Sequence, residues 1–213
     1  MPLYTTDALI LRTYKLGESD RIVVFLTRDR GKKRGVAKNA RQSRRRFGGA
    51  LEPLTAGRVQ YTERERRDLV FLHFVEPLRS PLAAADREAL GYVGYFAELI
   101  DEWAQEADPN EPLFRLGCSM VEAMAAGVPV EPLARYFEYW LLRLQGVYEL
   151  DARLSPDARA FLAAARTCSP LGVAGIEASR DALRELERAH GALIGLHLEK
   201  ELKSARVLRD MRR

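Results

Sequence analysis

Residues 21–46 read RIVVFLTRDRGKKRGVAKNARQSRRR, and this stretch joins an apolar segment to a strongly basic one. Its first part, Arg21–Thr27, is rich in β-branched and aromatic residues and is typical of a strand. Its second part, Arg28–Arg46, holds ten Lys or Arg residues and one acidic residue. Gly31 and Gly35 interrupt the basic part, which favours turns and a strand over a continuous basic helix. The stretch therefore predicts a β-domain with a dense cationic segment.

Further strand-like segments lie on both sides of this stretch. They are Asp7–Tyr14, the short Val36–Ala37, Ala50–Thr62 and Asp68–Val75. Glycines punctuate the segments, and the intervals are too short to contain helices, which disfavours a parallel sheet. Five short strands in about 75 residues predict a small antiparallel barrel.

The pattern becomes helical after Glu76–Pro77, where apolar residues recur at intervals of three and four. Predicted helices cover residues 86–104, run from Pro112 to Gly127 and from Pro129 to Gly146, and begin after the capping residues Ser155 and Ser179. The fold class is therefore α+β, with a barrel over residues 1–76 and an all-helical domain over residues 77–213. Because a barrel of this size has a thin core, we expect the helices to pack against it.

The chain of 213 residues carries a net charge of +4, but the charge is unevenly distributed. The net charge is +9 over residues 1–75, −8 over residues 76–194 and +3 over residues 195–213. A basic domain of this size indicates a polyanionic partner, and phosphate binding by the run Arg28–Arg46 is the favoured interpretation. A solvated loop or an import-like signal is the alternative for the same run. Phe47, which follows the run, either closes the end of the barrel, the favoured interpretation, or stacks on a base.

The composition excludes several other classes. With 47% hydrophobic and 30% charged residues, the chain is an ordinary foldable one without a membrane-length apolar segment or a signal peptide. Two distant cysteines, Cys118 and Cys168, exclude a disulfide framework and a four-cysteine zinc site and fit a reduced, cytosolic protein.

Signals for catalysis are weak. His73 falls in a strand pattern, and the last predicted helix places His190 and His197 on an apolar stripe with Leu183, Leu186 and Leu193, so we expect core histidines and no metal site. No phosphate-binding glycine loop, nucleophile with a base, or metal cluster is evident, and we expect no enzyme and no cofactor.

Several of these segments resemble RecO, a family of bacterial recombination mediators and DNA-annealing proteins. In the barrel the matching pieces are ALILRTYKLGESDRIVVFLTRDRG at 8–31, KKRGVAKNAR at 32–41, SRRRFGGALEPL at 43–54 and DLVFLHFVEP at 68–77. The run Gly17-Glu18-x-Asp20-Arg21-Ile22 is the most specific of them. In the helical part, Arg135-Tyr136-Phe137-Glu138 with the leucines and glycine up to Gly146, and LKSARVLRDM at 202–211, are similar to the family as well.

One departure from the family pattern concerns zinc. Many members insert a four-cysteine zinc module after the helix that ends at Gly146. Here the chain runs from Gly146 to Arg153 and directly into Leu154-Ser155-Pro156, which resembles the next helix of the family. The module is missing from this position, so zinc is not carried over.

The resemblance implies an OB-fold barrel of five strands followed by a helical domain. It implies binding of single- and double-stranded DNA, annealing of complementary strands, and a complex with RecR that helps to load the recombinase RecA. It also implies that the acidic, Phe-ended tail of single-strand-binding protein docks on the helical domain, in the cytoplasm at the nucleoid. The main alternative is an RNA-binding or ribosome-associated OB-fold protein, and a nuclease or esterase is a distant third.

Individual residues carry these expectations. Lys38 and Arg41 lie on the VAKxxR element that the family places on its DNA face. Local charge alone adds Lys32, Lys33, Arg34, Arg44, Arg45 and Arg46. Arg135 matches the family position that meets the partner tail. Arg143 is a candidate helper, and Leu141 and Leu142 are candidates for a neighbouring apolar pocket, although a core role explains both leucines better.

Overall fold

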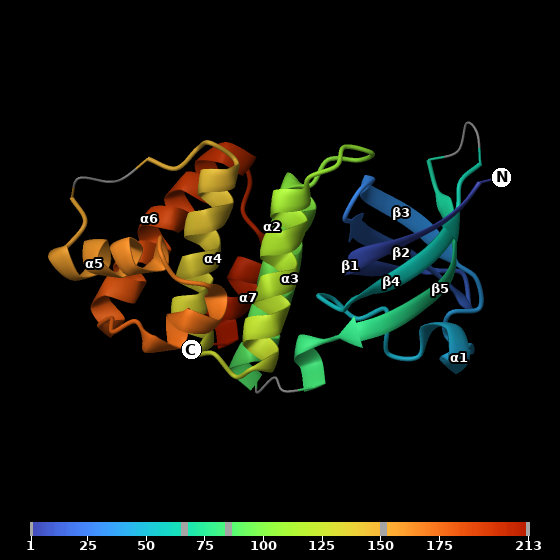
Figure 1. Ribbon diagram of the computed structural model, residues 1–213, viewed down its shortest axis with the longest axis horizontal. Coiled ribbons are helices and arrows are strands. Elements are labelled where there is room, and N and C mark those ends of the chain that lie inside the picture. The colour runs from blue at the N-terminus through green and yellow to red at the C-terminus, as the bar shows by residue number, and fades with distance from the viewer. Residues whose placement is uncertain (1, 65–67, 84–86, 150–152, 212–213) are drawn as a thin grey trace.

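Five strands close into a barrel in the order β1-β2-β3-β5-β4 in the computed structural model, which describes residues 2–64, 68–83, 87–149 and 153–211 (Figure 1). The strands are β1 Leu3–Leu16, β2 Asp20–Thr27, β3 Gly31–Ala37, β4 Ala56–Thr62 and β5 Val70–Arg79. All neighbouring strands are antiparallel except β3 and β5, which pair in parallel over Gly35–Ala37 and Val70–Leu72. A short helix, α1 Arg44–Phe47, lies between β3 and β4. The predicted barrel is confirmed as an OB-type fold.

Several of the predicted strand limits were wrong, including the start of β4, which lies at Ala56 and not at Ala50. The third strand begins at Gly31 and not at Val36, because the outward positions of a strand tolerate Lys and Arg side chains. The last strand continues through Pro77 to Arg79, past the predicted boundary at residue 76. Pro77 lies opposite Gly57, directly beside an irregularity in the register, which is where a strand accepts a residue without a backbone N–H.

The barrel buries a small apolar core of its own. Alternate residues of β1 and β2 point inward, among them Ile10 and Phe25, and β4 adds Tyr61. Phe47 is 3% exposed and packs in the same cluster. The aromatic ring therefore closes the end of the barrel, as favoured above.

The outward face of β1 and β2 supports the helices. Leu9, Leu11, Val24 and Leu26 belong to the same buried cluster as the apolar side chains of the helical part. The helices lie beside the barrel along the long axis of the molecule, with α2 and α3 nearest to it (Figure 1). The barrel and the helices thus share one apolar core, as a barrel with a thin core requires.

The helical part begins after a 3-10 turn at Pro81–Ala83 and ends with a helix that the sequence did not indicate. Its helices are α2 Arg87–Trp103, α3 Glu111–Ala125, α4 Val130–Leu144, α5 Pro156–Ala165, α6 Arg180–Leu198 and α7 Lys203–Met211, with a 3-10 segment at Pro170–Gly175. Ser155 and Ser179 cap α5 and α6 through their hydroxyl oxygens, as predicted. The helix α7 was missed because a single buried side chain, Leu208, marks its apolar face.

The apolar stripe of α6 was also placed wrongly. Its buried residues are Ala182, Leu186, His190 and Ile194, whereas His197 is exposed and stacks on Trp103 at 5.6 Å between ring centroids. His73 is exposed as well, and its Nε2 lies 2.9 Å from Thr62 Oγ1. Only His190 is a core histidine, because the stripe is rotated by a small angle from the predicted one.

Polar contacts fix the barrel to α2. Asp101 accepts Lys32 Nζ through its backbone oxygen at 2.6 Å, and its carboxylate pairs with Lys32 at 3.2 Å and with Arg12 at 3.1 Å. The loop after α2 also bonds to β3, since Lys32 N donates to Gln105 O at 3.1 Å. No helix in the described ranges has the length and apolar run needed to cross a membrane.

Candidate nucleic-acid interface

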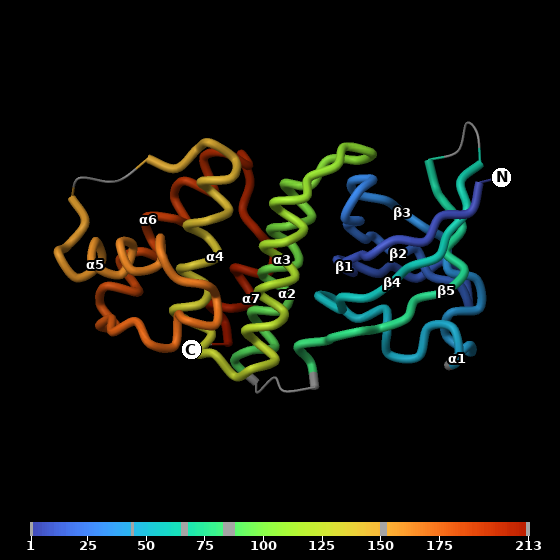
Figure 2. The backbone as a smooth tube through the Cα atoms, viewed as in Figure 1, coloured from blue at the N-terminus to red at the C-terminus, as the bar shows by residue number. Residues whose placement is uncertain are grey.

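A basic loop, residues 38–46, follows β3 in the connection to β4 at the end of the barrel and includes the start of α1. Figure 2 shows this connection on the side of the barrel that faces away from the helices. The loop is held by the hairpin between β1 and β2. Asp20 Oδ1 accepts Asn39 N at 2.8 Å, Ser19 O accepts Arg41 N at 3.2 Å, and Glu18 O accepts Arg41 Nη1 at 3.1 Å. The Gly-Glu-x-Asp motif thus positions the loop.

The cations on and beside the basic loop are not neutralised. Arg34, Lys38, Arg41 and Arg45 are exposed, and none pairs with a carboxylate within the described part of the chain. Arg46 is half-buried and donates to Lys38 O at 2.7 Å, so it braces the loop while keeping its charge. Unpaired cations gathered on one surface create the positive potential that attracts a phosphate backbone. The side chain of Arg44 lies outside the part that the structure describes.

Two of the predicted phosphate-binding residues serve other contacts. Lys32 faces α2 and pairs with Asp101, and Lys33 pairs with Glu63 at 2.8 Å. Each lysine side chain is 16% exposed. A count of charges along the sequence could not distinguish these two lysines from the exposed cations. The distinction depends on the alternation of β3, which directs Lys32 toward α2 and Lys33 toward the barrel end. The structure therefore does not bring them together with Lys38 and Arg41.

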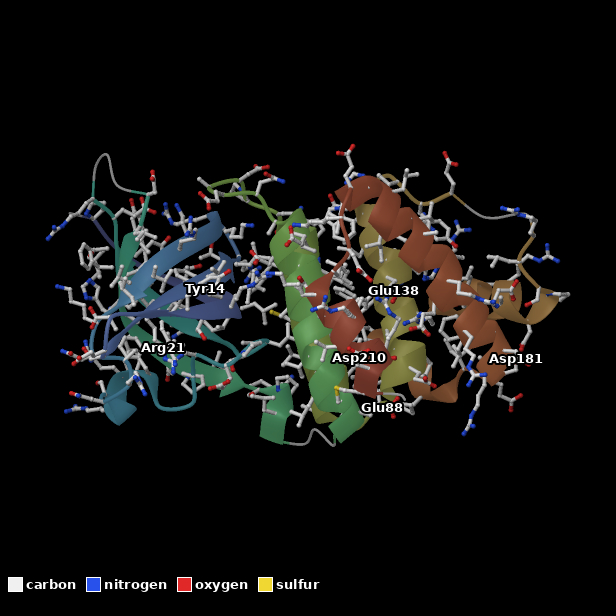
Figure 3. All side chains as sticks on the ribbon, turned by 180° about the vertical axis from the view of Figure 1, so that it is seen from behind. Tyr14, Arg21, Glu88, Glu138, Asp181 and Asp210 are labelled. Carbon is white, nitrogen blue, oxygen red and sulfur yellow. The ribbon has the colours of Figure 1, made fainter. Side chains whose placement is uncertain are left out.

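Two further cations, which lie outside the basic run in the sequence, stand beside the start of the basic loop. Lys15 and Arg21 pair across the β1–β2 hairpin, and Arg21 in turn pairs with Ala37. The three therefore lie on the same face of the sheet, and Ala37 packs in the cluster that holds Phe47. Arg21 is labelled on the barrel in Figure 3. The strand register shows that Lys15 and Arg21 lie in one row with Ala37, which the linear sequence does not indicate.

The predicted partner-tail residues are not brought together. Leu141 and Leu142 are completely buried in the helical core, as the favoured explanation required. Arg143 is exposed and lies over Trp140, 5.5 Å from its ring, and donates to Tyr139 OH at 2.8 Å. Arg135 has 4% of its side chain exposed. The two leucines cannot line an open pocket as they stand, because the core covers them.

Arg135 belongs to a buried polar cluster centred on Glu138. Its Nη2 lies 3.0 Å from Glu138 Oε1, Tyr95 OH donates to the same oxygen at 2.8 Å, and His190 Nδ1 lies 3.1 Å from Oε2. Burial and the charge of Glu138 raise the pKa of Tyr95 well above its ordinary value. Burial alone would lower the pKa of Arg135, but the charge of Glu138 raises it. Arg135 is therefore fixed as a cation inside the fold.

A groove next to this cluster has apolar walls and a rim of mixed charge, with Arg188, Lys200 and Arg209 beside Glu187 and Glu201. It measures about 570 Å³ and lies between α6 and α7. Ile194, Leu202 and Leu208 line it, Arg135 reaches its inner end, and Arg188 stands at its edge. Arg188 is exposed and has no carboxylate partner among the described residues. Sequence reasoning missed the groove because part of its wall comes from α7, a helix that the sequence did not indicate.

No group of three or more His, Cys, Asp or Glu side chains in the described ranges is arranged to hold a metal ion. Cys118 and Cys168 are free and half-buried. Burial raises the pKa of the Cys118 thiol to about 12, so this thiol stays protonated near neutral pH.

The closed barrel, its exposed cationic loop and the attached helices define an OB-fold protein with an electropositive face. The family models agree: "Recombination protein O N terminal" matches residues 1–81 and "Recombination protein O C terminal" matches residues 84–151. The chain belongs to the RecO family.

Curated relatives named DNA repair protein RecO are similar to it. The protein of Koribacter versatilis is 43% identical over 145 residues, and that of Anaeromyxobacter sp. is 41% identical over 146 residues. These matches cover 68% of this chain but 59% and 58% of the relatives' lengths. The protein of Geobacter sulfurreducens is 33% identical over 237 aligned residues, which cover 96% of this chain and 97% of the relative.

Proposed function

We propose that this chain binds DNA and anneals complementary single strands as a recombination mediator in DNA repair. Membership of the RecO family supports the class, and the exposed cationic loop of the barrel is the observation that carries the binding role. The loop meets phosphates through charge and not through base edges, so it accepts single and double strands with little sequence dependence. Two bound strands repel each other less once cations offset their phosphates, which favours annealing.

The family resemblance extends the proposal to partners. The chain forms a complex with RecR that helps to load the recombinase RecA on DNA coated by single-strand-binding protein, in the cytoplasm at the nucleoid. It needs no cofactor, zinc or catalytic group for this role, because positioning the strands is sufficient.

Strand annealing tests the proposal directly. Two complementary oligonucleotides, each coated with single-strand-binding protein, are mixed with the purified chain and annealing is followed by energy transfer. We expect annealing by the wild type and strong loss in the triple variant Lys38→Glu, Arg41→Glu, Arg45→Glu. The matched control reverses three exposed arginines of the helical part, Arg159, Arg166 and Arg180, and retains annealing. Absence of annealing by the wild type, or selective annealing of RNA, refutes the proposal.

We also propose that the groove between α6 and α7 receives the acidic tail of single-strand-binding protein. The net charge of −8 over residues 76–194 opposes this docking at long range. At about 0.15 M salt the Debye length is about 8 Å, so distant acids are screened while a rim arginine still meets a carboxylate directly. The apolar wall suits a terminal Phe, whose burial contributes about 1.5–3 kcal/mol.

A tail peptide distinguishes the groove from the other arginine face of the helical part. Arg188→Ala should weaken peptide binding several-fold, removal of the terminal Phe should weaken it roughly tenfold or more, and Arg143→Ala should leave it unchanged. Fluorescence anisotropy of a labelled peptide measures all three. Arg135→Ala is a poor probe, because it leaves the buried carboxylate of Glu138 without its guanidinium. If Arg143→Ala weakens binding and Arg188→Ala does not, the tail docks over Trp140 instead.

A further inference from the structure

An apolar row crosses the outer surface of the barrel beyond the area that the helices cover. In the strand register Tyr14 lies opposite Ile22, Ile22 opposite Val36, and Val36 opposite Phe71. The four side chains therefore stand side by side on β1, β2, β3 and β5. With adjacent strands about 4.8 Å apart, the row is roughly 14 Å wide.

The row faces outward and not into the barrel. A β-carbon at Gly35, one residue before Val36, would meet Phe25 and Leu72 of the barrel core at 3.2 and 3.3 Å. Because neighbouring side chains of a strand point to opposite faces, Val36 and its partners in the row point away from that core. None of the four belongs to either buried cluster, and Tyr14 is 43% exposed. Figure 3 shows Tyr14 on the barrel surface.

Cations border this row. Arg34 lies two residues before Val36 on β3 and shares its face, and Lys38 follows the end of β3, two residues after Val36. Lys38 Nζ lies 5.8 Å from the centre of the Phe71 ring, and the guanidinium of Arg64 lies 4.7 Å from it. Arg34 and Lys38 have no carboxylate partner within the described ranges. An apolar and aromatic row flanked by Arg34 and Lys38 matches a single DNA strand whose bases and phosphates lie side by side.

We propose that this row is a subsite for the unpaired bases of single-stranded DNA, with the Tyr14 ring as its stacking surface. The inference rests on the proposed DNA-binding function and adds a strand preference to it. In a duplex the base faces are already stacked on each other, so only an unpaired strand can use the row. The basic loop then contacts phosphates of both forms, and the row strengthens binding of the single strand alone.

The stacking ring can be removed without disturbing the barrel core, because Tyr14 is largely on the surface. Tyr14→Ala should weaken binding of a single strand roughly tenfold, the size of one lost base–aromatic stack, while duplex affinity and the salt dependence stay unchanged. Tyr14→Phe keeps the ring and should bind as the wild type does. Leu16→Ala is the matched control, since Leu16 is 38% exposed on the same strand but lies opposite Asp20, outside the row.

Anisotropy titrations with a single strand and with a duplex of equal length measure these affinities, and a 2-aminopurine base in the single strand reports stacking through its quenching. Equal losses for single strand and duplex in Tyr14→Ala, or no loss in either, overturn the subsite. The triple variant Lys38→Glu, Arg41→Glu, Arg45→Glu distinguishes failure of the base subsite from failure of the proposed DNA-binding function. If that variant binds both DNA forms as the wild type does, the DNA-binding role of the loop itself is wrong.

Discussion

Asp20 is an acidic residue whose contacts support a basic surface. Its carboxylate accepts the backbone N–H of Asn39, a residue with a left-handed backbone at φ 52°. Asn adopts this region more readily than most non-glycine residues, and the hydrogen bond helps to hold the turn. This backbone turn directs the side chains of Lys38 and Arg41 toward the solvent.

Removal of this carboxylate gives a prediction with an unexpected sign. Asp20→Ala raises the net charge by one, so charge alone predicts tighter DNA binding. We expect weaker binding instead, by roughly two- to fivefold, because loss of a hydrogen bond worth about 1 kcal/mol lets the basic loop spread. Asp20→Asn keeps an oxygen acceptor and serves as the control. Anisotropy titration with a single strand measures all three proteins, and tighter binding by Asp20→Ala would disprove the positioning role.

Individual residues also show where a linear sequence is informative. Phe47 was placed correctly, because a large aromatic residue directly after a solvated run has few other buried places. Lys32 and Lys33 were grouped wrongly with the phosphate contacts, because their partners Asp101 and Glu63 are distant in sequence. Charge can be counted along a chain, but its neutralisation depends on the fold.

At the scale of elements, the C-terminal helix α7 depends on one carboxylate of α2. Glu98 accepts Lys203 N at 3.2 Å and Ser204 N at 2.7 Å, and the Ser204 hydroxyl also donates to it. These are the unsatisfied N–H groups at a helix start, which a negative charge stabilises. Although burial alone would raise the pKa of Glu98, these hydrogen bonds lower it below its ordinary value of 4.5. Neighbouring Lys200 pairs with Glu102.

The sign of this shift predicts a pH dependence. A lowered folded-state pKa contributes stability above the ordinary value of 4.5, and the contribution is lost as pH falls through the lowered value. At pH 7 we expect Glu98→Gln to lower the free energy of unfolding by on the order of 1 kcal/mol, and the gap should close as pH falls below 4.5. Urea unfolding measures the gap, with Glu52→Gln as an exposed control remote from α7. A gap that is constant with pH contradicts this role.

The elements themselves were largely predictable, since periodicity and capping residues mark them locally. The five strands and the helices up to α6 appear near their predicted positions. The exceptions are elements whose character depends on distant neighbours. The strand β3 carries basic residues because one of its faces meets α2 and its other face lies at the end of the barrel. The helix α7 is polar because only Leu208 of its apolar face is buried. The groove beside α7 was hidden for the same reason.

At the scale of the whole molecule, the barrel and helices form a joined unit. Asp101 bridges Arg12 and Lys32, and the space beside Gly31 is closed by the backbone of Asp108, 2.4 Å from where a β-carbon would stand. Gly31 also has φ +67°, which favours glycine. This junction turns Asp101 of α2 toward the barrel, so the helical part offsets Lys32 while the loop at residues 38–46 stays positive. The charge division seen in the sequence is thus a division between surfaces.

The salt dependence of DNA binding tests this charge division most directly. The slope of log affinity against log salt concentration counts the phosphate contacts, about 0.7 for each on a single strand. We predict that the triple variant Lys38→Glu, Arg41→Glu, Arg45→Glu lowers the magnitude of the slope by about 2 relative to the wild type. Reversal of Arg159, Arg166 and Arg180 should leave the slope as it is. An unchanged slope in the first variant, with the fold intact, would contradict the account and place the phosphate contacts elsewhere on the molecule.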